Sequence, residues 1–136
     1  MRTAFFLRIA SGFSLFLAAG HTLGGLRSWS PIGESEVLRA MRTFRFEVER
    51  VSRTYLDFYR GIGFLLSVYL LLQAVVLWQA ATLAKTNPLA ARPMILSFLL
   101  ASVVNGILTW IFILPVPTLV TAVITACLGL ALFASR

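Results

Sequence analysis

Residues 57–83 decide the fold: they read D-F-Y-R-G-I-G-F-L-L-S-V-Y-L-L-L-Q-A-V-V-L-W-Q-A-A-T-L, with no charged residue between Arg60 and Lys85. A helix needs about 20 mostly apolar residues to cross the hydrocarbon core of a bilayer, and this stretch is long enough. Three further segments have the same character, 3–26, 94–114 and 116–135. The sequence therefore predicts four membrane spans in a single domain covering residues 1–136.

The composition excludes an ordinary water-soluble fold. Of the 136 residues, 59% are hydrophobic and only 12% are charged, whereas about a quarter of a soluble domain is charged. The net charge of +7 favours anionic lipid over nucleic acid as the partner, because the apolar residues lie in long runs. The single cysteine, Cys127, allows no intrachain disulfide and no cysteine-based metal cluster.

We therefore expect an all-α membrane protein, a four-helix antiparallel transmembrane bundle. The short Pro115-Val116-Pro117 connection predicts a tight hairpin between the third and fourth spans. Residues 85–93 are expected to form a polar turn, with Pro93 in the first turn of the third span, where proline is tolerated. The first span has a rival interpretation as a cleaved signal peptide, with small residues at Ala18-Ala19-Gly20.

The connection between the first and second spans carries an apolar stripe at three- and four-residue steps. Its members are Val37, Leu38, Met41, Phe44, Val48, Val51 and Tyr55. This spacing predicts an amphipathic helix over about residues 34–56, lying on the bilayer surface or packing over the bundle mouth. The distribution of arginines favours the cytoplasmic side for this connection.

Ionisable groups inside a membrane usually face the bundle interior and indicate function. His21 lies near the end of the first span and Asp57 at the start of the second, so antiparallel spans bring both to one leaflet. One hypothesis is a pocket in which Asp57 orients His21 as a proton shuttle or a donor to a lipid-like ligand. The competing interpretation is that Arg53 and Arg60 neutralise Asp57 at helical spacing. The candidate catalytic residues are His21 and Asp57, and the candidate ligand-binding residues are His21, Arg53, Asp57, Tyr59, Asn105 and Trp110.

Glycines mark candidate helix contacts. Gly20 and Gly24 have G-x-x-x-G spacing and Gly61 lies one turn after Asp57, which predicts close packing of the first two spans. A homodimer face is the alternative. The tryptophans suit interfacial belts. The residues identify no cofactor and no metal site, and one histidine cannot supply both axial ligands of a haem in a monomer.

Two stretches carry family-like motifs: Gly20-His21-Thr22-Leu23-Gly24-Gly25, and residues 53–63, R-T-Y-L-D-F-Y-R-G-I-G. They resemble a family of small bacterial four-span membrane proteins with G-H-T-x-G-G and R-T-Y-x-D-F-Y-x-G-x-G stretches. Members often have Trp where this chain has Leu56. The resemblance covers most of the chain, and it implies a location in the bacterial cytoplasmic (inner) membrane but no substrate. The family positions it implies are His21, Arg53, Tyr55, Asp57, Tyr59 and Gly61.

Two classes of function stay open. The first is a non-enzymatic accessory subunit or lipid- or lipophile-binding module, with membrane lipid, other membrane subunits or a second copy as partners. The second is a small membrane enzyme acting on an apolar substrate, with His21 and Asp57 as the acid–base pair and Tyr59 and Asn105 orienting the ligand. A four-span multidrug exporter is disfavoured, because such exporters depend on an acidic residue inside the first span and residues 3–26 contain none.

Overall fold

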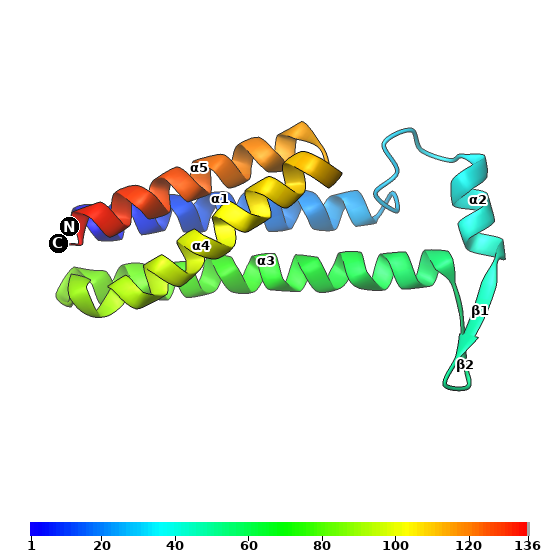
Figure 1. Cartoon of the computed structure of the whole chain (residues 1–136), viewed down its shortest axis with the longest axis horizontal. Coiled ribbons are helices and arrows are strands. Elements are labelled where there is room, and N and C mark those ends of the chain that lie inside the picture. The colour runs from blue at the N-terminus through cyan, green and yellow to red at the C-terminus, as the bar shows by residue number, and fades with distance from the viewer. Residues whose placement is uncertain (136) are drawn as a thin grey trace. The chain divides into compact units, whose positions relative to one another are not determined.

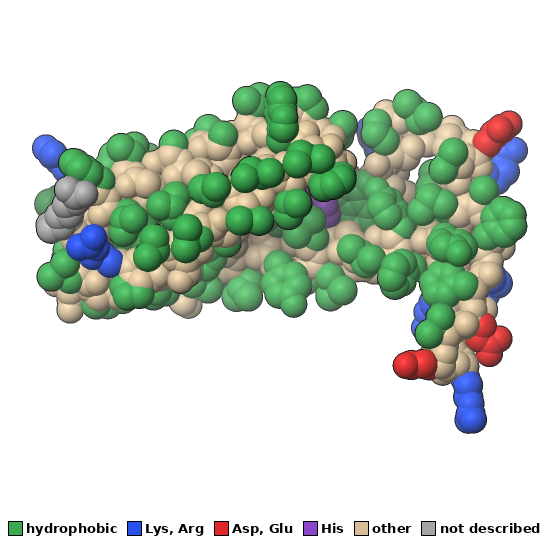
Figure 2. Space-filling view, in the orientation of Figure 1, with side chains coloured by type: hydrophobic (Ala, Val, Ile, Leu, Met, Phe, Trp, Pro, Cys, Tyr) green, Lys and Arg blue, Asp and Glu red, His purple; other side chains and the backbone are tan. Residues whose placement is uncertain are grey.

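A computed structural model describes residues 1–135, which form five helices and one β-hairpin (Figure 1). Four of these helices are long and apolar enough to cross a membrane: α1 (Arg2–Gly25), α3 (Tyr55–Thr86), α4 (Pro88–Phe112) and α5 (Pro115–Ala134). The prediction of four apolar helices of spanning length is confirmed. On the face drawn in Figure 2, hydrophobic side chains cover these helices, as expected for a lipid-facing surface.

The described residues divide into two compact units. The first comprises Met1–Leu17 and the residues from Leu70 onward, and the second comprises Ala18–Tyr69. The first unit has a core to which all four long helices contribute, and most of its members are small. Alanine lets helices approach closely in lipid, where dispersion contacts replace the hydrophobic effect. The core residues are Ala4, Leu7, Ala10, Leu77, Ala80, Ala81, Ala84, Ala91, Ile95, Ile124, Cys127, Leu128 and Ala131.

Buried polar side chains of the first unit find partners on neighbouring helices. The Ser11 hydroxyl donates to the Ala74 carbonyl oxygen at 2.7 Å, and the Gln73 amide donates to the Ser14 hydroxyl at 2.9 Å. Within the described residues, the Thr121 hydroxyl is the buried side-chain group without a partner. These bonds matter because an unpaired polar group is costly in an apolar interior.

The connection between α3 and α4 is shorter than the sequence suggested. The predicted polar turn over 85–93 is wrong, because α3 continues to Thr86 and α4 begins at Pro88. Asn87 is the N-cap of α4 and its side chain accepts from the Ala90 amide at 3.1 Å, which is a favoured helix start when proline follows. Pro93 therefore lies inside α4 and not in its first turn. The α4–α5 hairpin is tight, as expected, and the two helices pack together. Its connection is Ile113-Leu114, however, and the predicted connection Pro115-Val116-Pro117 forms the first turn of α5.

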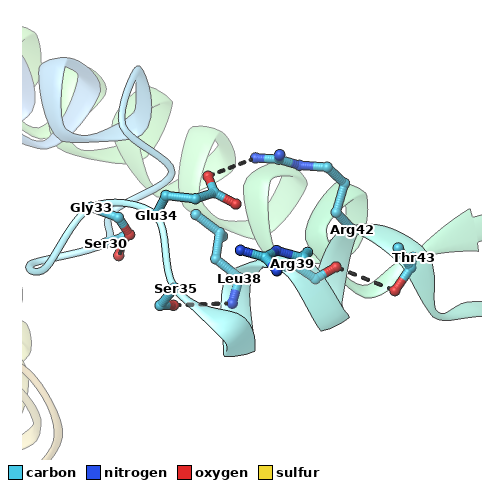
Figure 3. Close-up of polar contacts among 8 residues, drawn as sticks. All are labelled: Ser30, Gly33, Glu34, Ser35, Leu38, Arg39, Arg42 and Thr43. Carbon is cyan, nitrogen blue, oxygen red and sulfur yellow. Dashed lines mark hydrogen bonds and ion pairs between the residues drawn. The ribbon is translucent and has the colours of Figure 1, made fainter.

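The second unit contains the connection between α1 and α3, and here the predicted helix over 34–56 is wrong. Helix α2 spans Glu36–Thr43, and a β-hairpin follows, with β1 at Arg45–Val48 and β2 at Val51–Thr54. The Ser35 hydroxyl caps α2 by accepting from the Leu38 amide at 3.2 Å (Figure 3). The fold is thus mainly helical, as expected, with one small antiparallel hairpin that the sequence did not predict.

The hairpin has a two-residue turn at Glu49 and Arg50, whose φ angles are +53° and +67°. Two positive φ values identify a type I′ turn, which matches the natural twist of the strands. The register pairs Phe46 with Arg53 and Val48 with Val51. Since side chains alternate along a strand, these four share one face of the hairpin. Figure 1 shows the hairpin running across the direction of α3 where that helix begins.

The apolar face of the hairpin is turned toward the start of α3. The Phe46 ring lies 5.1 Å from the Tyr55 ring and 5.8 Å from the Phe58 ring, measured between centroids. Val48 and Val51 stand on the same face, and 59% and 46% of their surfaces are exposed. The opposite face carries only polar residues, Arg45, Glu47, Ser52 and Thr54, while Arg53 lies on the face of Phe46.

The turn provides a stability test. Glu49→Asn with Arg50→Gly places the preferred residues of a type I′ turn at both positive-φ positions, and we expect the amides of Val48 and Val51 to exchange about tenfold more slowly, since left-handed backbone costs L-residues roughly 1–2 kcal/mol each. Hydrogen exchange in detergent measures this. Glu49→Gln with Arg50→Gln is the control, because it removes the charges and leaves the turn preference unimproved. Equal protection in both variants would contradict the turn assignment.

Candidate functional site: the Trp29 cradle

The end of α1 is closed by a backbone motif that directs the chain out of the helix. The Trp29 amide donates to the Gly24 carbonyl oxygen and the Ser28 amide to the Gly25 carbonyl oxygen, both at 3.0 Å. This six-to-one and five-to-two pattern is a Schellman motif. Its left-handed position is normally glycine, but here Ser28 holds φ at +53° and Trp29 follows at +48°. A bulky residue with positive φ is an outlier, so other contacts must hold Trp29.

Those contacts come from three glycines, which with the indole form what we call the Trp29 cradle (Trp29, Gly24, Gly25 and Gly63). A Cβ on Gly25 would lie 2.8 Å from the indole ring, a Cβ on Gly24 would lie 3.1 Å from it, and a Cβ on Gly63 would overlap the ring. The Phe64 ring lies 5.1 Å from the indole between centroids. The absent side chains are therefore the space into which the indole fits.

The predicted helix-packing role of the glycines is changed by this geometry. Gly24 packs against the Trp29 indole, not against a facing helix, and nothing described lies within 4 Å of a Cβ built on Gly20 or on Gly61. Of the two glycines with G-x-x-x-G spacing, only Gly24 therefore has a close neighbour, and that neighbour is the Trp29 ring. The two glycines that share the tryptophan with Gly24 are Gly25 and Gly63.

His21 lies at one border of the cradle. The Trp29 indole Nε1 donates to the His21 carbonyl oxygen at 2.9 Å, and the two rings lie 5.1 Å apart between centroids. His21 Nδ1 lies 2.9 Å from the Ser67 hydroxyl, which donates to the Gly63 carbonyl oxygen at 3.4 Å. The imidazole and the hydroxyl are thus within hydrogen-bond distance, and the histidine tautomer decides which of the two groups donates.

Asp57 has a structural partner of its own at the start of α3. Its carboxylate accepts from the Thr54 amide at 3.1 Å, and the Thr54 hydroxyl accepts from the Asp57 amide at 3.0 Å. This reciprocal pair is a capping box, which satisfies two amides that the helix leaves free. Within residues 1–135, the hydrogen bonds of His21 and Asp57 go to Ser67 and Thr54 and do not join the two side chains.

The remaining candidate residues are dispersed. The Tyr59 ring meets the Trp29 indole edge-on at 5.9 Å between centroids. Arg53 is exposed on β2, and its guanidinium donates to the Ser52 carbonyl oxygen at 3.0 Å. Asn105 and Trp110 are exposed on α4, in the other unit. Of the predicted set, the structure brings His21 and Tyr59 together around Trp29. It also places Arg53 near enough to the Asp57 carboxylate for the two charges to interact.

The central residue of this cluster, Trp29, is not among the predicted site residues. The sequence predicts an interfacial belt for Trp29 and helix contact for Gly63, next to Gly61, and it does not single out Ser67. Gly63 and Ser67 are four residues apart on α3 and therefore share a helix face, as do His21 and Gly25 on α1. That spacing was the available signal, but it does not reveal which aromatic ring fills the gap.

The chemistry available at the cradle is hydrogen bonding and aromatic packing. Within residues 1–135, no group of three or more His, Cys, Asp or Glu side chains is placed to hold a metal ion. An open apolar depression on α1, lined by Ile9, Gly12, Phe13 and Phe16, belongs to the first unit. Comparisons with models of protein families, with curated proteins and with solved structures gave no match.

The cradle predicts opposite effects for two glycines two residues apart. Gly63→Ala should lower the free energy of unfolding by about 1–3 kcal/mol, because overpacking forces the indole to move. Gly61→Ala should be neutral or stabilising by up to about 1 kcal/mol through helix propensity. Thermal unfolding in detergent distinguishes them. In a Trp29→Ala background, Gly63→Ala should lower the free energy of unfolding much less than it does in the wild-type protein. The same loss in both backgrounds would rule out the cradle.

The capping box predicts which pairs of residues are coupled. Thr54→Val and Asp57→Ala should each cost about 1 kcal/mol, and the double variant should cost little more than one of them. His21→Ala and Asp57→Ala should be additive within about 0.5 kcal/mol, as expected for residues without a shared contact. Double-mutant cycles on detergent unfolding measure both couplings. Strong coupling between His21 and Asp57 would restore the acid–base pair.

Proposed function

We propose that this protein is an integral membrane protein that binds anionic lipid at one bilayer surface through its extramembrane segment, residues 26–60. In this proposal it is a non-catalytic lipid-binding module of the bacterial inner membrane, with the segment on the cytoplasmic side. The resemblance of the two motif stretches supports a location in the bacterial inner membrane. The arginine distribution supports the cytoplasmic side for residues 26–60. The observation that carries the proposal is the two-faced hairpin, whose apolar face is turned toward the start of α3.

The direction of this face follows from the helix that it contacts. Helix α3 has 32 residues and is about 48 Å long at 1.5 Å per residue, more than the roughly 30 Å of a hydrocarbon core. Its first turns therefore extend into the headgroup region. Phe46 contacts Phe58, which lies further along α3 than Tyr55. The face that carries Phe46, Val48 and Val51 thus points along α3, in the direction in which the helix enters the bilayer.

Lipid is the occupant that suits this face. The exposed valines lie on one face of the hairpin, and the other face is polar. Such an element fits the headgroup boundary, where it buries its apolar face and hydrates its polar face. Arg53 shares the apolar face and Arg60 lies in the second turn of α3. Arginine side chains at this depth can place their stems along acyl chains and their guanidinium groups on phosphates.

The charges of the segment favour anionic headgroups over neutral ones. Residues 26–60 contain Arg27, Arg39, Arg42, Arg45, Arg50, Arg53 and Arg60 and all five acidic residues of the chain. Within residues 1–135, the ion pair is between Arg42 and Glu34 at 3.3 Å, with both side chains more than half exposed (Figure 3). Such a pair contributes little stability. Arg45 and Arg53 interact with the Asp57 carboxylate, and we expect the other guanidinium groups of the segment to be available to phosphate.

The catalytic alternative receives less support from the contacts of its candidate residues. His21 bonds Ser67 and Asp57 completes a capping box. A general base must reach the proton that it removes and be oriented by a partner. Here the Asp57 carboxylate caps the start of α3, and the His21 imidazole contacts Ser67 on α3.

Spin labels on neighbouring residues test the position of the hairpin. In a Cys127→Ala background, nitroxides are attached at Val51→Cys on the apolar face and at Ser52→Cys on the polar face, in vesicles of phosphatidylcholine and phosphatidylglycerol. We expect the label at position 51 to be more accessible to oxygen, and the label at position 52 to a water-soluble nickel chelate. The same accessibility at both positions would mean that the hairpin does not lie on the bilayer.

Lipid preference is tested separately by native mass spectrometry. The protein should retain phosphatidylglycerol over phosphatidylcholine, and Arg53→Gln with Arg60→Gln should reduce that preference by roughly tenfold to thirtyfold, at about 1 kcal/mol for each arginine. Arg92→Gln on α4 is the matched control and should leave it unchanged. An equal loss in the control would contradict a site in residues 26–60.

A further inference from the structure

We propose that the outer edge of β1 pairs with the same edge of a second copy of this chain, giving a four-stranded antiparallel sheet in the order β2–β1–β1–β2. In this pairing Phe46 lies opposite Phe46 of the second copy, and Arg45 lies opposite Glu47 of the second copy. The inference goes beyond lipid binding, because it concerns how two copies assemble.

The hydrogen-bond pattern identifies which backbone groups of β1 are free. The Tyr55 amide donates to the Phe44 carbonyl oxygen, so the 44–55 pair is of the hydrogen-bonded kind. Pairs alternate along an antiparallel ladder, and the register therefore makes 46–53 and 48–51 bonded pairs as well. The amide and carbonyl groups of Arg45 and Glu47 must then point away from β2, toward the open edge.

The edge of β2 is not open in the same way. Its outward amide at Thr54 donates to the Asp57 carboxylate, and its outward carbonyl at Ser52 accepts from the Arg53 guanidinium. No comparable bond within residues 1–135 occupies the outer edge of β1. An unpaired strand edge is a template for another strand, and an isolated two-stranded hairpin is only marginally stable in water.

Charge and register together select a second copy as the occupant. Across the hairpin Arg45 faces Thr54 and Glu47 faces Ser52, so neither residue has an opposite charge as its cross-strand neighbour. The acidic group that Arg45 interacts with is Asp57 at the start of α3. Pairing β1 with itself antiparallel about Phe46 places each arginine opposite a glutamate. It also makes both of these pairs hydrogen-bonded ones, because all four residues direct their backbone groups to the shared edge. The strand R-F-E is therefore self-complementary in both charge and backbone hydrogen bonding.

The geometry of a bilayer permits this assembly. Two copies inserted in the same direction are related by a two-fold axis along the bilayer normal, and the two-fold axis of an antiparallel strand pair is perpendicular to the sheet. A hairpin that lies flat with Phe46 toward lipid meets both conditions, and this one step rests on the proposed function. The paired sheet joins two apolar faces, with the Phe46 rings as a cross-strand aromatic pair.

Disulfide trapping tests the register. In a Cys127→Ala background, Phe46→Cys places two cysteines at a non-hydrogen-bonded pair with Cα atoms about 4.5 Å apart, within the range that a disulfide spans. Ser52→Cys is the matched control, because three strand spacings, about 14 Å, would separate its two copies. Under mild oxidation in membranes we expect at least a tenfold excess of covalent dimer at position 46. Equal yields at 46 and 52 would overturn the register.

Charge reversal tests the pairing with residue 46 intact. Arg45→Glu alone and Glu47→Arg alone each place like charges opposite one another, and we expect each to weaken dimerisation by about tenfold, measured by single-molecule photobleaching in vesicles. The double reversal, Arg45→Glu with Glu47→Arg, should restore it, and so should mixing the two single variants. A dimer insensitive to all reversals, or a monomer at every protein density, would overturn the proposal.

The same experiments separate this proposal from lipid binding. Trapping at position 46 is done in phosphatidylcholine alone and with phosphatidylglycerol added. A dimer in phosphatidylcholine alone supports the pairing even if the lipid preference fails. Absence of a dimer in both overturns the pairing and leaves the lipid experiment to decide the proposed function by itself.

Discussion

The contact on which the second unit depends is the fit of one indole into the space left by three glycines. Trp29 follows a Schellman turn at the end of α1, and its ring occupies the positions where side chains of Gly24, Gly25 and Gly63 would lie. This contact joins α1, the connection and α3 at one point. Close packing is sensitive to single methyl groups, so the spacing of these two helices where the chain leaves α1 is determined by backbone as much as by side chains.

The candidate catalytic residues, His21 and Asp57, lie near the two helix ends that the connection joins, the end of α1 and the start of α3. A helix leaves its first amides and last carbonyls unpaired, and near hydrocarbon such groups are costly. The Schellman turn satisfies the end of α1, and Thr54 with Asp57 satisfies the start of α3. The R-T-Y-x-D pattern thus has a physical explanation in which threonine and aspartate, three residues apart, form a capping box. The threonine and the aspartate of this pattern therefore have a structural role at the start of α3.

The helices could be predicted from sequence because span length and hydropathy depend on composition. The hairpin could not, since the step of four from Phe44 to Val48 fits a helical period and a strand period equally well, and Glu49-Arg50 lacks the Asn-Gly signature of its turn. The alternation in Arg45-Phe46-Glu47-Val48 was the better signal. Gly20 and Gly24 looked equivalent because motif spacing reports proximity along a helix and not the ring that fills the gap. The roles of Trp29 and Ser67 depend on contacts between distant segments.

The hydrogen-bonding groups that have no partner indicate the surface at which we propose that this protein contacts other molecules. Among the described residues, Ser11, Gln73 and His21 each hydrogen-bond a partner on a neighbouring helix, and Thr121 is the buried hydroxyl that does not. Polar groups inside the helices are thus largely used to hold the helices. Outside them, the free backbone edge of β1, the charges of Arg45 and Glu47 and the exposed valines lie on one hairpin. On these observations we propose two partners for the hairpin, lipid beneath the sheet and a second strand beside it.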